Sequence, residues 1–216
     1  RAIQANLTMG EAYISYYEKN FTDESDLIEI RKLDVATYNE GLSGVVKGFA
    51  LPYKKFIDKY ENNAAALALY SLRKFQEVAT VPPGEVMGVF NEAMRAQIKA
   101  IKIDPENARA LYLKAFMGKV TSGIMRKELL EKAVEIAPES YDVLAGVATA
   151  YRFNDEPLTS IGFYQRALEI APFGPSDHKL NLLRAYIDTA KFNEAEILAR
   201  DMIASDKNSS YWGNIF

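Results

Sequence analysis

The chain of 216 residues contains no cysteine, one histidine and no surplus of basic residues. Without cysteine it can form neither disulfides nor thiolate metal sites, although both the cytoplasm and a bacterial periplasm fit as its compartment. Lys and Arg number 26 against 29 Asp and Glu, a net charge of −3. We therefore expect no nucleic-acid partner, because no basic excess exists to neutralise phosphates. The apolar runs are too short and too interrupted to cross a bilayer, so we expect no direct membrane insertion by this segment.

The apolar and charged content of the chain is ordinary. Hydrophobic residues make up 49% of the chain and charged residues 25%, which is typical of a folded soluble protein and argues against disorder. The first residue is Arg1, and the last segment, 211–216, is apolar and has no polar tail. From these ends we expect a fragment of a longer chain.

A short phrase recurs three times, at 100–105, 133–138 and 167–172. Each copy reads Ala, aliphatic, charged, Ile, a small or acidic residue, and Pro. The three prolines, Pro105, Pro138 and Pro172, are spaced 33 and 34 residues apart. A period of about 34 residues indicates a repeated helix–turn–helix unit.

The segment 141–174 carries this pattern most fully, and it resembles the tetratricopeptide repeat family. The positions that match the family pattern are Leu144, Val147, Ala148, Tyr151, Ser160, Tyr164, Ala167 and Pro172. Small residues at Ala148 and Ala167 let two helices approach closely, and Pro172 ends the second helix because proline cannot continue it. The resemblance covers residues 107–209 well and 62–106 weakly.

The resemblance implies an all-α fold, a right-handed superhelical solenoid of antiparallel helix pairs, preceded by divergent N-terminal helices. We expect residues 1–61 to form a helical cap and residues 62–216 to form the array. The expected units are 62–106, 107–140, 141–174 and 176–209, with the start of a further helix at 210–216. Within the cap we expect helices at 3–19, 22–39 and 45–60, the last bent at Pro52. Asp104 and Pro105 are expected to begin the helix that follows residue 107.

Candidate catalytic groups are few. His178, the single histidine, follows Pro175-Ser176-Asp177, and we interpret it as a solvated residue of a loop or cap with no nucleophile beside it. The acidic pairs Asp23-Glu24 and Asp155-Glu156 precede expected helices, where the helix dipole favours negative charge. We interpret both pairs as caps. The sequence therefore predicts no catalytic residues, no metal site and no cofactor, and the chain is not expected to be an enzyme.

The resemblance implies a protein–protein interaction scaffold that holds a peptide or a partner helix in its concave groove. In chaperone-binding members of the family, basic and amide side chains on the first helices clamp a carboxylate, and only Arg152, Asn181 and Arg184 offer that chemistry here. The clamp is incomplete, so heat-shock chaperone tails are disfavoured, while an acidic or carboxylate-bearing peptide suits the remaining groups. The residues predicted to contact the partner are Thr149, Arg152, Asn181, Arg184, Asp188, Tyr112 and Phe116.

Two alternatives stay open. Residues 64–116 are weakly similar to helical repeats that follow the sensory or catalytic part of some bacterial membrane-anchored regulators and adenylyl cyclases, which implies a regulatory or sensor region of a larger protein. A third possibility is a small ligand bound between residues 1–61 and the first repeat. Tyr13, Tyr16 and Tyr17 could form a platform for it, although such spacing is more typical of a helix–helix contact.

Overall fold

The computed structural model describes residues 20–40, 50–171 and 176–205, and all regular structure within these ranges is helical. This confirms the all-α prediction. None of the helices in the described ranges combines the length and the apolar character that a membrane span needs. The predicted segments 3–19 and 210–216, and residues 45–49 of the third predicted helix, lie outside the described residues.

The helices follow one another with short connections. Their bounds are α2 (Glu24–Glu40), α3 (Leu51–Lys59), α4 (Ala64–Glu77), α5 (Val86–Ile103), α6 (Ala108–Ser122), α7 (Lys127–Ile136), α8 (Tyr141–Phe153), α9 (Pro157–Ile170), α10 (Ser176–Asp188) and α11 (Phe192–Ser205).

Side-chain caps set where three of these helices begin. Asn63, Asn107 and Ser140 each accept a hydrogen bond from the backbone N–H three residues further on, at 3.1, 2.9 and 3.4 Å. Such caps satisfy amide donors that the first helical turn leaves unpaired. The helix begins at Ala108 as predicted, but the cap predicted at Asp104 is wrong, because Asn107 caps α6. Asp104 instead accepts from the N–H of Glu106 in the preceding turn.

The predicted caps and the predicted bend have different outcomes. Asp23 caps α2, since its carboxylate accepts from the backbone N–H of Ser25 at 2.9 Å. Glu156 makes no side-chain cap for α9 and instead binds Lys127 at 2.7 Å. Pro52 lies in the first turn of α3 and marks the beginning of that helix instead of a bend. A proline is tolerated there because the first turn needs no N–H from it.

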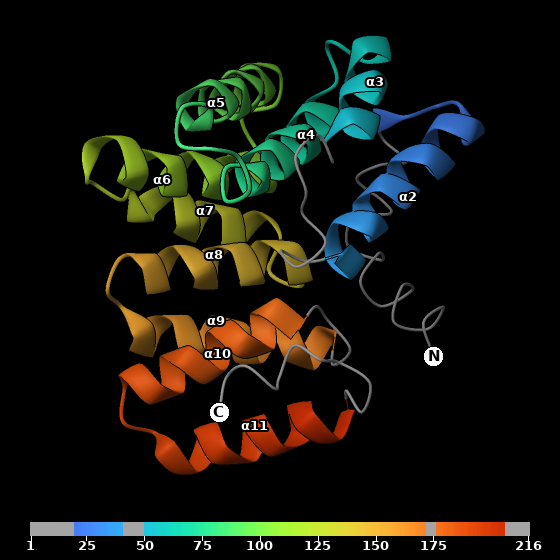
Figure 1. The fold of residues 1–216 in the computed structure, drawn as a ribbon. Coiled ribbons are helices and arrows are strands. Elements are labelled where there is room, and N and C mark those ends of the chain that lie inside the picture. The colour runs from blue at the N-terminus through green and yellow to red at the C-terminus, as the bar shows by residue number, and fades with distance from the viewer. Residues whose placement is uncertain (1–19, 41–49, 172–175, 206–216) are drawn as a thin grey trace.

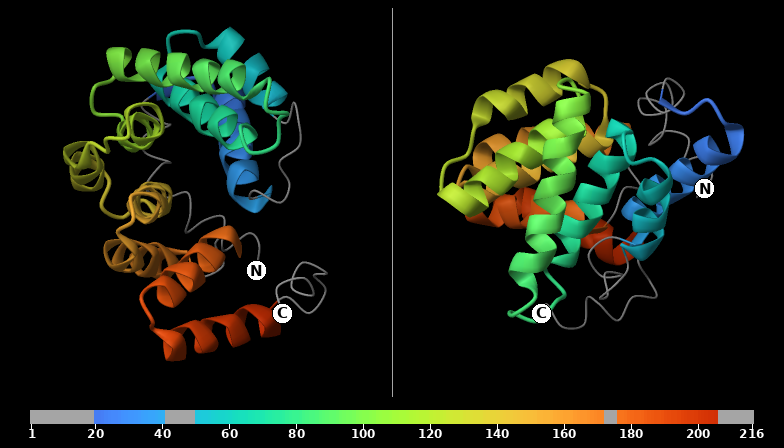
Figure 2. Two further views of the ribbon diagram at one scale, coloured as in Figure 1. Left: turned by 60° about the vertical axis from the view of Figure 1, so that its left-hand side comes forward. Right: turned by 90° about the horizontal axis from the view of Figure 1, so that it is seen from above.

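Consecutive helices pack as pairs, and the pairs stack (Figure 1). The pairs are α4 with α5, α6 with α7, α8 with α9 and α10 with α11. Each new first helix also packs against the pair before it: α6 against α4 and α5, α8 against α6 and α7, and α10 against α8 and α9. Figure 2 shows the same stack turned, with α2 and α3 beside the first pair. The handedness of the superhelix stays a prediction.

Burial follows the repeat pattern. Ala148 and Ala167 have no exposed surface, and Tyr164 between the paired helices has none either. Ala148 and Tyr164 also belong to the apolar cluster that includes Leu182 and Ala185 of the next pair. One pair alone would leave these faces in water, so adjacent pairs stabilise each other.

Candidate functional site: an apolar groove

A cavity of about 760 Å³ lies against the first helices of the pairs and the start of α5, and we call it the groove. Its size falls in the range of roughly 300–1,000 Å³ that is typical of ligand sites. The side chains that line it come from α4, α5, α6, α8 and α10, and most are apolar. They are Leu72, Phe75, Gln76, Val78, Ala79, Val86, Met87, Phe90, Tyr112, Leu113, Phe116, Val120, Thr121, Asp142, Gly146, Thr149, Phe153, His178 and Asn181.

The stacking of the first helices brings these residues to one surface. On α6 the groove is lined by Tyr112, Phe116 and Val120, and on α8 by Gly146, Thr149 and Phe153, among others. Residues spaced by three or four positions share one face of a helix. Each first helix therefore presents one face to the groove and its remaining surface to its neighbours.

A row of phenylalanines runs across the groove. Ring centroids are 5.9 Å apart for Phe90 and Phe75, 5.1 Å for Phe75 and Phe116, and 5.1 Å for Phe116 and Phe153. Tilted and edge-on contacts at these distances stabilise the aromatic pairs beyond their buried area. The row joins α5, α4, α6 and α8 into one continuous apolar wall of the groove.

Three large apolar side chains in the groove are exposed. Met87, Val120 and Phe153 keep 62%, 57% and 54% of their surface accessible. Scattered exposed apolar residues are ordinary, but a contiguous set in a concave surface marks an interaction site. These three side chains would lose the most water-exposed apolar surface if the groove were filled.

A set of hydrogen-bonded polar side chains lies at the groove near the start of α8. The Tyr112 hydroxyl donates to Asp142 at 3.1 Å, and Nε of Arg109 donates to the same carboxylate at 2.6 Å. The ring of Tyr112 lies on Gly146, where an added Cβ would come within 2.6 Å of two ring carbons. Glycine at this position is what lets α6 and α8 approach with the tyrosine between them.

A second polar group surrounds Tyr164 under the groove. Its hydroxyl is 2.9 Å from that of Thr149. Burial raises the pKa of Tyr164 to about 12, against the smaller lowering effects of Thr149, Arg152 and Asn181. The hydroxyl is therefore protonated at neutral pH and serves as a hydrogen-bonding group.

His178 lies in the first turn of α10 and is half-buried. Its Nδ1 is 2.5 Å from the Tyr141 hydroxyl, and its ring packs against Tyr141 and Tyr164, with centroids at 5.3 and 6.2 Å. The interpretation as a solvated loop histidine is wrong, because the stacking of α10 on α8 brings the imidazole against these rings. His178 joins the two helices and lines the groove.

The structure brings four of the seven predicted contact residues to the groove. Tyr112, Phe116, Thr149 and Asn181 line it. Arg152 lies beside it, with the guanidinium carbon 4.8 Å from the centroid of the Phe153 ring.

The other two predicted residues, Arg184 and Asp188, are exposed on α10, beyond Asn181 along the helix and outside the lining of the groove. Sequence reasoning missed the apolar lining from α4 and α5, including Phe75, Met87 and Phe90. The sequence did hold a signal for this lining: these two helices carry more aromatic and aliphatic residues than one buried helix face requires.

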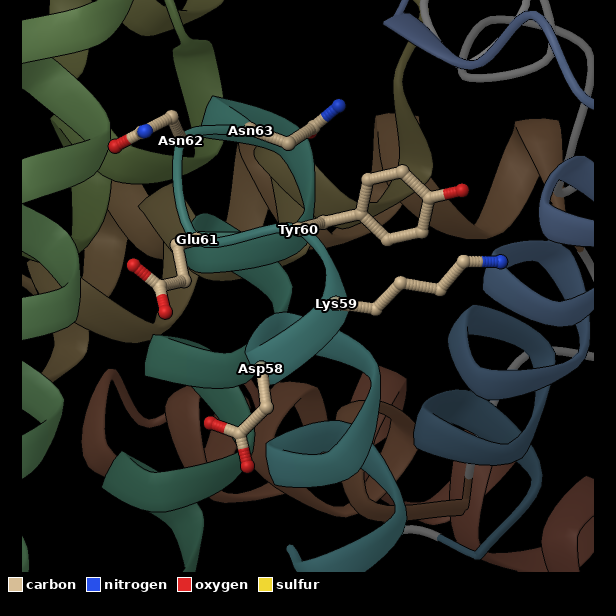
Figure 3. A pocket seen from close by; sticks show the side chains of 6 residues that line it. All are labelled: Asp58, Lys59, Tyr60, Glu61, Asn62 and Asn63. Atoms are coloured by element: carbon tan, nitrogen blue, oxygen red, sulfur yellow. The ribbon is translucent and has the colours of Figure 1, made fainter.

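A hollow of about 530 Å³ lies at the turn between α3 and α4 and is lined by six consecutive residues, 58–63. Its side chains do not converge (Figure 3): Lys59 extends toward α2, where it pairs with Asp26, while Asp58 and Glu61 point elsewhere. We therefore take the groove as the candidate site. Within the described residues, no group of three potential metal ligands gathers anywhere.

Comparisons with known proteins give matches among solved structures only. No protein-family model matches the sequence, and no curated protein matches it either. Among solved structures, the crystal structure of the MamA protein is similar, with 17% sequence identity and a TM-score of 0.48. The match covers 85% of this chain and 93% of that one. The all-helical architecture described above rests on the structure itself.

Proposed function

We propose that the chain is a tetratricopeptide-type scaffold, and not an enzyme, whose groove holds a segment of a partner protein. The observation that carries the proposal is the exposed apolar lining contributed by the first helices α4, α6, α8 and α10 together with α5, with Met87, Val120 and Phe153 at its open surface. We also propose that the array spans residues 62–216 in the units given above and that residues 1–61 cap it.

The lining defines the chemistry of the partner segment. Asp142 is the only charged residue among the groove's lining residues, and it is held by Arg109 and Tyr112. A charged peptide would lose water there without gaining a counter-charge. An amphipathic helix with large apolar side chains at spacings of three and four would instead bury its apolar face on the phenylalanine row.

The polar contacts predicted from sequence fit one edge of such a complex. Asn181 and Thr149 line the groove, and Arg184 is exposed three residues beyond Asn181 on α10. Nε of Arg152 is buried and has no hydrogen-bond partner within the described residues. We propose that these groups bind a backbone carbonyl or an acidic side chain at the end of the bound segment, so an acidic group is expected there and not along its length.

The test is selection of binding peptides from a displayed library, followed by titration against variants. Phe153→Asp and Met87→Asp should each weaken the selected peptides at least about tenfold, because each places an unpaired charge in the interface. Leu158→Asp is the matched control, since Leu158 is 67% exposed on α9 and does not line the groove. Equal affinities for all three variants, each confirmed as folded by circular dichroism, would reject the groove as the binding surface.

A further inference from the structure

A buried arginine at the start of α6 binds carboxylates of both α2 and α8. Nη2 of Arg109, in the first turn of α6, donates to Asp34 of α2 at 2.9 Å. Its Nε donates to Asp142 of α8 at 2.6 Å. Arg109 is 1% exposed, so one guanidinium bridges three helices away from water.

The same chain of contacts continues into the groove. Asp142 accepts from the Tyr112 hydroxyl at 3.1 Å, and both residues line the groove. Asp34, Arg109, Asp142 and Tyr112 thus form one connected set, which we call the latch. A displacement of Tyr112 or Asp142 by an occupant acts directly on a group that also binds α2.

The latch differs from the other polar contacts of α2. The Tyr53 hydroxyl donates to the carbonyl of Leu33 at 2.7 Å, and Lys59 pairs with Asp26, but both of these contacts go to α3. The Asp34–Arg109 contact instead reaches α6. A buried guanidinium that loses one carboxylate must rearrange or admit water. Loss of either carboxylate is therefore expected to disturb the whole latch.

We propose that α2 is a strap whose contact with α6 is coupled through the latch to the shape of the groove. An occupant that shifts Tyr112 or Asp142 weakens the attachment of α2. Because coupling between sites is reciprocal, release of α2 changes the free energy of binding in the groove by the same amount. The occupant belongs to the proposed function, whereas the coupling itself is a property of the free protein.

The first test is hydrogen exchange on the full chain without any ligand. Tyr112→Phe keeps the ring and removes only the hydroxyl that binds Asp142, so exchange across residues 24–40 should accelerate by about fivefold or more. Tyr164→Phe is the matched control, because it removes a buried hydroxyl that contacts Thr149 and no member of the latch. Unchanged exchange in α2 of Tyr112→Phe, or equal acceleration in both variants, would overturn the proposal.

The second test starts from the strap. Asp34→Asn removes the carboxylate charge that Arg109 binds and should accelerate exchange in the first turns of α6 and α8. Asp26→Asn, on the same helix, should change exchange only in α2 and α3. If the first turns of α6 and α8 exchange alike in both variants, the coupling is wrong. Should Asp34→Asn not fold, the comparison of Tyr112→Phe with Tyr164→Phe decides alone. Because neither test uses a ligand, failure of the groove as a partner site would leave both results unaffected.

Discussion

Replacing Gly146 with alanine tests the closest packing in the groove. The new methyl group would lie 2.6 Å from two ring carbons of Tyr112 and 2.9 Å from a third. The ring has little room to move, because Tyr112 is 2% exposed and its hydroxyl binds Asp142. Overpacking of this kind costs about 1–3 kcal/mol. Alanine is also better than glycine inside a helix by about 1 kcal/mol, which offsets part of that cost.

Gly162→Ala separates the two contributions. Gly162 lies within α9, and an added Cβ there would meet no atom within 4 Å. It should gain the helix term of about 1 kcal/mol without the clash. We therefore expect Gly162→Ala to be more stable than the parent and Gly146→Ala to be less stable than Gly162→Ala by about 1–3 kcal/mol.

The assay is urea unfolding followed by far-ultraviolet circular dichroism, which gives the free energy of unfolding for each variant. In a Tyr112→Leu background, Gly146→Ala should cost less free energy of unfolding than it does in the parent, since the ring that it meets is gone. Equal stabilisation by both alanines would refute the close contact between α6 and α8.

Three further predictions follow from other contacts. Ala167→Phe puts a large ring where Ala167 is fully buried, so the thermal midpoint should fall by the equivalent of about 1–3 kcal/mol or more; an unchanged midpoint would contradict the repeat register. The double variant Arg152→Glu/Arg184→Glu should stay folded. Relative to the parent, its affinity for peptides with an acidic end should fall at least about tenfold more than its affinity for peptides with a neutral end. If both affinities fall equally, the acidic end binds elsewhere. The hydrogen bond from Lys127 lowers the pKa of Glu156 below its ordinary 4.5. The ion pair therefore stabilises the fold above that pH, and this stabilisation is lost as the pH falls through the pKa of Glu156 in the folded protein. Thermal midpoints from pH 7 to pH 3 should consequently fall less steeply in Glu156→Gln, and parallel profiles would show that the pair contributes nothing.

Local signals in the sequence predicted the helices well. Periodic apolar residues, the recurring prolines and polar caps each depend on neighbours within a few positions, so α4 to α11 were expected close to where they lie. The errors were local too. Asn107 was passed over because Asp104-Pro105 is an equally good helix start by composition, and Pro52 suits a first turn as well as a bend.

The site was less predictable because its contacts join repeats. Gly146 has meaning only beside Tyr112, and Arg109 only beside Asp34, which is 75 residues away. Nothing in a single unit indicates such pairs. The sequence identified Thr149, Asn181 and Phe116, whereas the other phenylalanines of the row, Phe75, Phe90 and Phe153, were not predicted.

The most direct measurement of the central claim is hydrogen exchange of the chain with and without a selected amphipathic peptide. If the groove is the binding surface, protection should appear on its lining segments, at residues 72–79, 86–90, 112–121 and 146–153. The outer helices α7, α9 and α11 should exchange as in the free protein. Protection confined to α7, α9 and α11, with the lining segments unchanged, would contradict the account.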